Sequence, residues 1–107
     1  MSDVIRARGP FLVLLTLKNG PKHGYEIASH IKEKGGGFFS VSFGSLYPIL
    51  HKLEKEGLVK GAWEEVGDAK NKKVYSLTSR GKKVLDEETC QYRNLIKVFS
   101  NLLEIKV

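Results

Sequence analysis

The sequence contains a single cysteine, Cys90, and only three histidines. One cysteine excludes an intramolecular disulfide and any cysteine-rich zinc site, and it suits a protein of the reducing cytoplasm. The histidines, His23, His30 and His51, lack the cluster of carboxylates or thiols that would complete a metal site. We therefore expect no metal ion and no other cofactor.

The sequence also lacks an apolar run long enough to span a membrane. Residues 11–15 are apolar and follow Arg6 and Arg8, which resembles a secretory signal, but no small-residue cleavage site follows them. We interpret the run as a buried helix that starts with Pro10 in its first turn and ends near Lys18. We expect no membrane contact and a cytoplasmic location.

Catalytic patterns are missing as well. No Ser/His/Asp triad or pair of carboxylates stands out, and the glycines at 35–37 do not fit the phosphate-binding GxxxxGK[ST] pattern. A chain of 107 residues forms one domain with one core, so a deep active site has little room. We expect no enzymatic activity.

Acidic residues are fewer than basic ones: 12 against 18, for a formal net charge of +6. Residues 69–83 contain no acid and hold six of the positive charges: Lys70, Lys72, Lys73, Arg80, Lys82 and Lys83. A charge run of this kind is often only a solvated face, but it also suits an anionic partner.

Periodicity predicts three helices, at residues 10–18, 24–34 and 42–56. Two strands are predicted to follow, at 58–66 and 72–78. A last helix is predicted to run from Thr78 or Ser79 towards residue 107. Residues 23–25 are expected to start the second helix, with the tyrosine ring on the core. A five-residue loop would place Trp63 opposite Tyr75, and Glu65 opposite Lys73. The predicted fold is mainly α with a small β-hairpin: a winged helix-turn-helix at residues 1–80, followed by a long dimerisation helix at 81–107.

The third helix has the composition of a recognition helix. Gly44 and Pro48 keep its outer face shallow, as close approach to a duplex requires. The polar and basic side chains around them are Ser42, Ser45, Tyr47, His51, Lys52 and Lys55. A solvated face of an ordinary amphipathic helix is the alternative. Because the basic wing, with Lys70, Lys72 and Lys73, follows directly, we favour double-stranded DNA as the partner.

The last helix carries an approximate heptad seam. Its members are Tyr92, Leu95, Ile96, Phe99, Leu102 and Leu103. The seam either folds back on its own domain or packs on a second copy. We favour a homodimer, because so small a bundle leaves little surface for a long helix to cover. Its recognition helices would lie about one DNA turn apart, near 34 Å.

Three ordered motifs resemble the PadR family of transcriptional regulators. Residues 17–27 read LKNGPKHGYEI, residues 44–59 contain GSLYPIL and LEKEGLV, and residues 75–81 read YSLTSRG. The resemblance covers about residues 11–85 and is to the short form with a single C-terminal helix. One departure lies in the wing, where many members have arginines and this chain has Lys72 and Lys73. Lysine is less favoured in a narrow minor groove, so this wing is expected to contact mainly phosphates.

The resemblance implies a dimeric repressor on a palindromic operator. The residues facing DNA would be Ser42, Ser45, Tyr47, His51, Lys52, Lys70 and Lys72. It also implies an effector pocket near the dimer interface for small hydrophobic or aromatic molecules, although the last helix offers Tyr92 and Phe99 and no tryptophan. Two alternatives stay open: a winged-helix module that binds only proteins, and a small-ligand-binding dimer.

Overall fold

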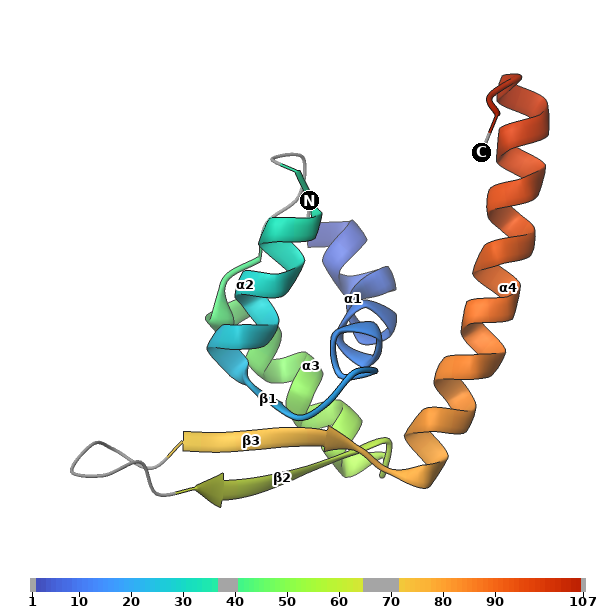
Figure 1. The fold of residues 1–107 in the computed structure, drawn as a ribbon. Coiled ribbons are helices and arrows are strands. Elements are labelled where there is room, and N and C mark those ends of the chain that lie inside the picture. Colours follow the sequence, from blue (N-terminus) through green and yellow to red (C-terminus); the bar gives the residue numbers. More distant parts are fainter. Residues whose placement is uncertain (1, 37–40, 65–71, 107) are drawn as a thin grey trace.

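The structure is a computed structural model that describes residues 2–36, 41–64 and 72–106. Its elements are, in chain order, α1 (Ser2–Thr16), β1 (Lys22–His23), α2 (Gly24–Lys34), α3 (Phe43–Lys55), β2 (Val59–Glu64), β3 (Lys72–Leu77) and α4 (Ser79–Leu103). Three helices form a bundle, the β2–β3 hairpin runs beneath it, and α4 rises beside it (Figure 1). The predicted order of three helices, a hairpin and a long helix is confirmed.

The core lies between the first three helices and the base of the hairpin. Its buried members are Val13, Leu14, Leu17, Ile27, Ile31, Leu46, Leu50, Leu53, Val59, Tyr75 and Leu85. In α3 they recur at intervals of three and four residues, which puts them on one face of a helix. The opposite face of α3, for which the sequence predicts an outward position, is left at the surface.

The first helix differs from the prediction. It begins at Ser2 and ends at Thr16, so Pro10 lies inside it and not in its first turn. A proline removes one helical hydrogen bond and usually clashes with the preceding residue. Here that residue is Gly9, whose missing Cβ relieves part of the clash. The apolar run after Pro10 then holds the helix in place by packing against the core.

The hairpin is shifted from its predicted register. The structure pairs Trp63 with Lys73 and Gly61 with Tyr75, so the expected Trp63–Tyr75 and Glu65–Lys73 pairs were wrong. The shift is two residues along β3, and each side chain therefore keeps its face of the sheet. Glu64 and Lys72 are the paired residues nearest the connection. The assumed five-residue loop was too short to allow that pairing.

The sheet also contains a third strand that the sequence analysis did not predict. β1 pairs with β3 in antiparallel fashion, which gives the order β1-β3-β2. It has only two residues, too few to show any alternation. By pairing with β3, it ties the start of α2 to the wing.

The start of α4 is fixed to the end of α3. Thr78 caps the helix by accepting a hydrogen bond from the Gly81 N–H, and its hydroxyl donates to the Gly57 carbonyl at 2.7 Å. Gly81 is buried, and a Cβ there would collide with the Leu58 carbonyl oxygen. These contacts set the direction in which α4 leaves the domain. Across the described ranges, no helix is both long and apolar enough to cross a membrane.

Candidate nucleic-acid interface

The outward face of α3 combines small and polar residues. Gly44, Pro48, His51 and Lys55 follow one another along it and are exposed. Ser45 and Lys52 lie at one edge of this face and Tyr47 at the other, also exposed. The face is therefore shallow at Gly44 and Pro48 and polar around them, as predicted from the sequence.

The two serines of the first turn have a structural role in α3. The Ser42 hydroxyl is the N-cap and accepts the Ser45 N–H at 3.2 Å, and the two hydroxyl oxygens are 3.1 Å apart. Both residues stay exposed. They hold the end of the helix while presenting polar atoms at the surface, beside the positive end of the helix dipole.

Aromatic rings form a continuous row from α2 to α3. Tyr25 stacks on Phe43 with centroids 4.9 Å apart, Phe43 meets Tyr47 edge-on at 6.3 Å, and Tyr47 stacks on His51 at 6.3 Å. Each aromatic pair contributes about 0.5–1.5 kcal/mol beyond its burial. We call these four residues the aromatic row. Tyr25 was expected on the core and is instead 69% exposed. Its position in α2 turns it away from Ile27 and Ile31, the side chains that the helix buries.

The wing is attached to α3 by an ion pair. Lys73 of β3 donates from Nζ to Oε1 of Glu54 at 2.9 Å, and both side chains are about 70% buried, with relative exposures of 27% and 31%. The hydrogen bond to Glu54 raises the pKa of the Lys73 ammonium above its usual value. The same ammonium lies 5.4 Å from the Tyr75 ring centroid and 5.9 Å from that of Trp63. A Cβ at Gly61 would collide with the Lys73 stem, so glycine leaves room for it.

Because of this ion pair, the wing lysines Lys72 and Lys73 have different surroundings. Lys73 is directed towards Glu54, within the protein. Lys72 is exposed, and Lys70 lies outside the described residues. Arg80, Lys82 and Lys83, at the start of α4, are exposed as well. The Glu54–Lys73 pair spans 19 positions in the sequence, and the sequence offered no signal for it.

The predicted seam of α4 divides into two parts. Tyr92 packs within its own chain: its ring stacks on Phe11 at 4.3 Å, and the Arg8 guanidinium carbon lies 5.8 Å from its centroid. The remaining members, Leu95, Ile96, Phe99, Leu102 and Leu103, are exposed, and Leu102 reaches 77%. We call these five residues the α4 stripe. It follows Tyr92 along α4, whose C-terminal part extends beyond the three-helix bundle (Figure 1).

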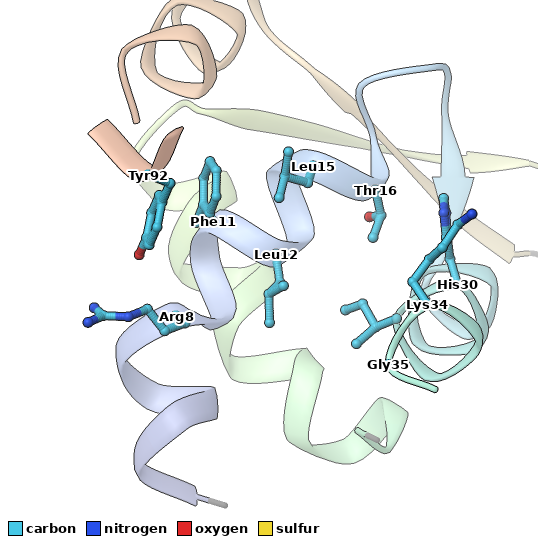
Figure 2. A pocket seen from close by; sticks show the side chains of 10 residues that line it. Arg8, Phe11, Leu12, Leu15, Thr16, His30, Lys34, Gly35 and Tyr92 are labelled. Carbon is cyan, nitrogen blue, oxygen red and sulfur yellow. The ribbon is translucent and has the colours of Figure 1, made fainter. Parts of the chain in front are cut away.

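A pocket of about 600 Å³ opens beside Tyr92. Figure 2 shows the stacked rings of Phe11 and Tyr92 along one side of it, and His30 and Lys34 of α2 along another. Leu12, Leu15 and Ile31 supply apolar lining. The described residues contain no group of three or more metal-ligating side chains. The pocket is thus an apolar space with basic side chains at its margin.

The family model of the PadR-like transcriptional regulators matches residues 13–87. The chain belongs to this family. The match covers α2, α3, the hairpin and the start of α4. The resemblance seen in the three motifs is confirmed, and the protein is a transcriptional regulator, which is not an enzymatic function.

Known PadR proteins are similar in sequence and in fold. The negative transcriptional regulator PadR of Bacillus subtilis is 36% identical over 77 residues, which are 72% of this chain and 42% of that protein. The crystal structure of Bacillus subtilis PadR with operator DNA matches with a TM-score of 0.69 at 35% identity, over 75% of this chain and 45% of the other. This chain therefore spans less than half the length of that relative.

A relative of the same length matches over almost the whole chain. The PadR-like transcriptional regulator of Bacillus cereus has a TM-score of 0.82 at 25% identity and covers 97% of this chain and 99% of its own. The agreement includes α4. The predicted winged-helix fold with one long C-terminal helix is confirmed.

Proposed function

We propose that this PadR-family protein is a cytoplasmic repressor that binds a palindromic operator in double-stranded DNA as a homodimer. In this proposal α3 enters the major groove through Ser42, Ser45, Tyr47, His51 and Lys52. The wing follows the adjacent backbone with Lys70 and Lys72. Lys73 belongs to the same interface but acts from within, by holding the wing against α3.

The proposal rests on one observation: the exposed face of α3 and the wing lie side by side and are held together by an ion pair. The outer face of α3 is exposed, shallow and polar, and the Glu54–Lys73 ion pair fixes the adjacent hairpin to that helix. A helix with this surface fits the major groove, where base edges can be read by short polar side chains. The relative from Bacillus subtilis, a negative regulator with a structure on operator DNA, supports the same use here.

The homodimer is supported by the α4 stripe. Five large apolar side chains are exposed in succession on a helix of 25 residues. An exposed apolar patch of this kind marks an interaction site. A second copy of α4 would cover it and relate the two α3 helices by a two-fold axis, which a palindromic operator requires.

The pocket beside Tyr92 supports release of the operator by an effector. Apolar side chains line it, with Arg8, His30 and Lys34 among its residues, so it suits a small hydrophobic or aromatic molecule. Tyr92 connects α4 to α1 at this place. A ligand in the pocket would therefore shift α4 and change the distance between the two α3 helices.

Selection from a random-sequence duplex pool, using the purified full chain, tests the function. We expect one enriched palindrome, with an affinity that falls steeply as salt rises, because lysines that bind phosphates release counterions. The double variant Lys70→Ala/Lys72→Ala should bind every duplex more weakly, with a salt slope reduced by about one per lost phosphate contact. Lys18→Ala/Lys32→Ala, which removes the same charge from exposed positions outside α3, the wing and the pocket, is the matched control.

The alternatives give different results in the same assays. A winged-helix module that binds only proteins would enrich no duplex at any salt concentration. A small-ligand-binding dimer would bind aromatic compounds in calorimetry without any change in its DNA complex. The first result would overturn the repressor proposal, and the second would overturn release of the operator by an effector.

A further inference from the structure

The aromatic row reaches beyond the helix to which we assign operator reading. It starts at Tyr25, in the first turn of α2, and ends at His51 on α3. Tyr25 and Tyr47 both pack on Phe43, and both are largely exposed, at 69% and 54%. The two phenol rings are thus held at one surface from two different helices.

Phe43 is fixed in this position by the backbone of α2. It is half-buried and lies so close to Gly24 that a Cβ on that glycine would collide with the ring. Tyr25 then covers the phenylalanine from the next position in the chain. The Phe43 ring thus lies between the α2 backbone at Gly24 and the Tyr25 ring. Because Tyr25 stacks on this fixed ring, its orientation is defined before DNA binds.

The chemistry of the Tyr25 position suits a phosphate. A phenol hydroxyl donates a hydrogen bond without carrying charge, and tyrosine is one of the side chains that contact DNA phosphates. The neighbouring acid, Glu26, is held towards the residue that precedes α2. Its Oε1 accepts the His23 N–H at 3.0 Å and lies 3.2 Å from Nε2 of the same residue.

We propose that Tyr25 is a further DNA-contacting residue, whose hydroxyl binds a backbone phosphate at the edge of the groove that α3 enters. Phe43 is the positioning residue that holds it there. This inference rests on the proposed operator binding. It assigns to α2 a direct contact with DNA. The aromatic row would then set the distance between this phosphate contact and the groove contacts of Tyr47.

The test uses the duplex that the wild-type chain enriches from the random pool. Tyr25→Phe removes only the hydroxyl and should weaken binding about tenfold, as expected for a lost hydrogen bond to a charged group. The salt slope should stay unchanged, because a neutral hydroxyl displaces no counterion. Phosphate-ethylation interference should lose one sensitive phosphate per half-site relative to the wild type.

Phe43 is tested by Phe43→Leu, with Phe43→Tyr as the aromatic control. The leucine variant should lose the same phosphate signal as Tyr25→Phe while keeping its melting temperature within a few degrees; the tyrosine variant should retain the signal. Adding Tyr25→Phe to Phe43→Leu should cost less than Tyr25→Phe alone, because Phe43 acts partly through Tyr25.

The outcomes separate this inference from the function on which it rests. If the wild-type chain enriches no duplex, the operator proposal fails. If it enriches one and Tyr25→Phe keeps both its affinity and its full interference pattern, then Tyr25 makes no phosphate contact and only this inference is overturned. An intact phosphate signal in Phe43→Leu would contradict the positioning role alone.

Discussion

Lys73, on the wing strand β3, donates a 2.9 Å hydrogen bond from Nζ to Oε1 of Glu54 on α3. The two residues belong to the two elements that would contact DNA together. Their ion pair fixes the angle between those elements in the free protein. Lys73 thus contributes to geometry more than to surface charge.

Replacing Glu54 should therefore affect binding through the wing. Glu54→Gln is expected to cost about 1 kcal/mol of stability, as for a partly exposed ion pair, and to weaken binding of the enriched duplex more than of random DNA. Glu56→Gln removes the same charge from an exposed site at the end of α3 and serves as the control. Urea denaturation and duplex titration provide the measurements. Equal effects of the two variants would show that only the charge matters.

Stability should fall at alkaline pH. The hydrogen bond to Glu54 raises the pKa of Lys73 above 10.5, and burial raises the pKa of Tyr75 above 10.0. Both groups hold their protons more tightly in the folded chain, so the unfolded chain releases them first as pH rises. The contribution of these two groups to the free energy of unfolding should be constant below about pH 10 and should decrease above it.

Urea denaturation across that range measures the effect. Lys73→Met removes the lysine contribution, so its stability should depend less on pH above about pH 10, while Tyr75 still contributes. A wild-type chain that becomes more stable in alkali would contradict the sign of both shifts.

Two glycines should respond to alanine in opposite ways. Gly81→Ala places a methyl group against the Leu58 carbonyl and should cost about 2–4 kcal/mol, because backbone must move. Among the described residues, the nearest atom to a Cβ at Gly44 would be the Ser42 hydroxyl oxygen at 3.8 Å, an ordinary contact distance. Gly44→Ala should be neutral or stabilise the chain by about 0.5 kcal/mol.

For Gly44→Ala, DNA binding should respond differently from stability. Its methyl group would stand on the shallow face of α3, so Gly44→Ala should lower the affinity for the enriched duplex despite the unchanged fold. Thermal denaturation and duplex titration separate the two effects. Unchanged affinity would show that DNA does not approach the backbone at this position.

The α4 stripe should control association. Phe99→Asp puts a charge in its centre and is expected to give a monomer in sedimentation velocity, with the helical content of the winged domain retained. Asn94→Asp introduces the same charge on another side of α4, where Asn94 is exposed, and should remain dimeric. A dimer in both variants would place the interface elsewhere.

The predictable parts of this fold were those with strong local signals. The apolar spacing of Leu46, Leu50 and Leu53 was enough to orient α3, and the caps at Ser42 and Thr78 marked the starts of two helices. The outer face of α3 followed from its buried face. Most of the proposed interface could therefore be predicted from sequence.

The parts that were missed depend on contacts between distant positions. The hairpin register follows from a longer connection than the turn residues suggested, and β1 is too short to have a pattern. The Glu54–Lys73 pair and the packing of Phe43 over Gly24 join residues 19 positions apart. Neither has a periodic signal, because each exists only once α2, α3 and the wing are assembled.

The continuity of α4 restricts how this chain can change its length. One helix carries both Tyr92, which anchors it to α1, and the exposed side chains that follow from Leu95. A residue inserted between them would rotate everything beyond it by about 100°, and the anchor and the stripe would face different directions. Viable length variants should add or remove three or four residues, close to one turn. The operator spacing of such proteins would then change in steps and not gradually.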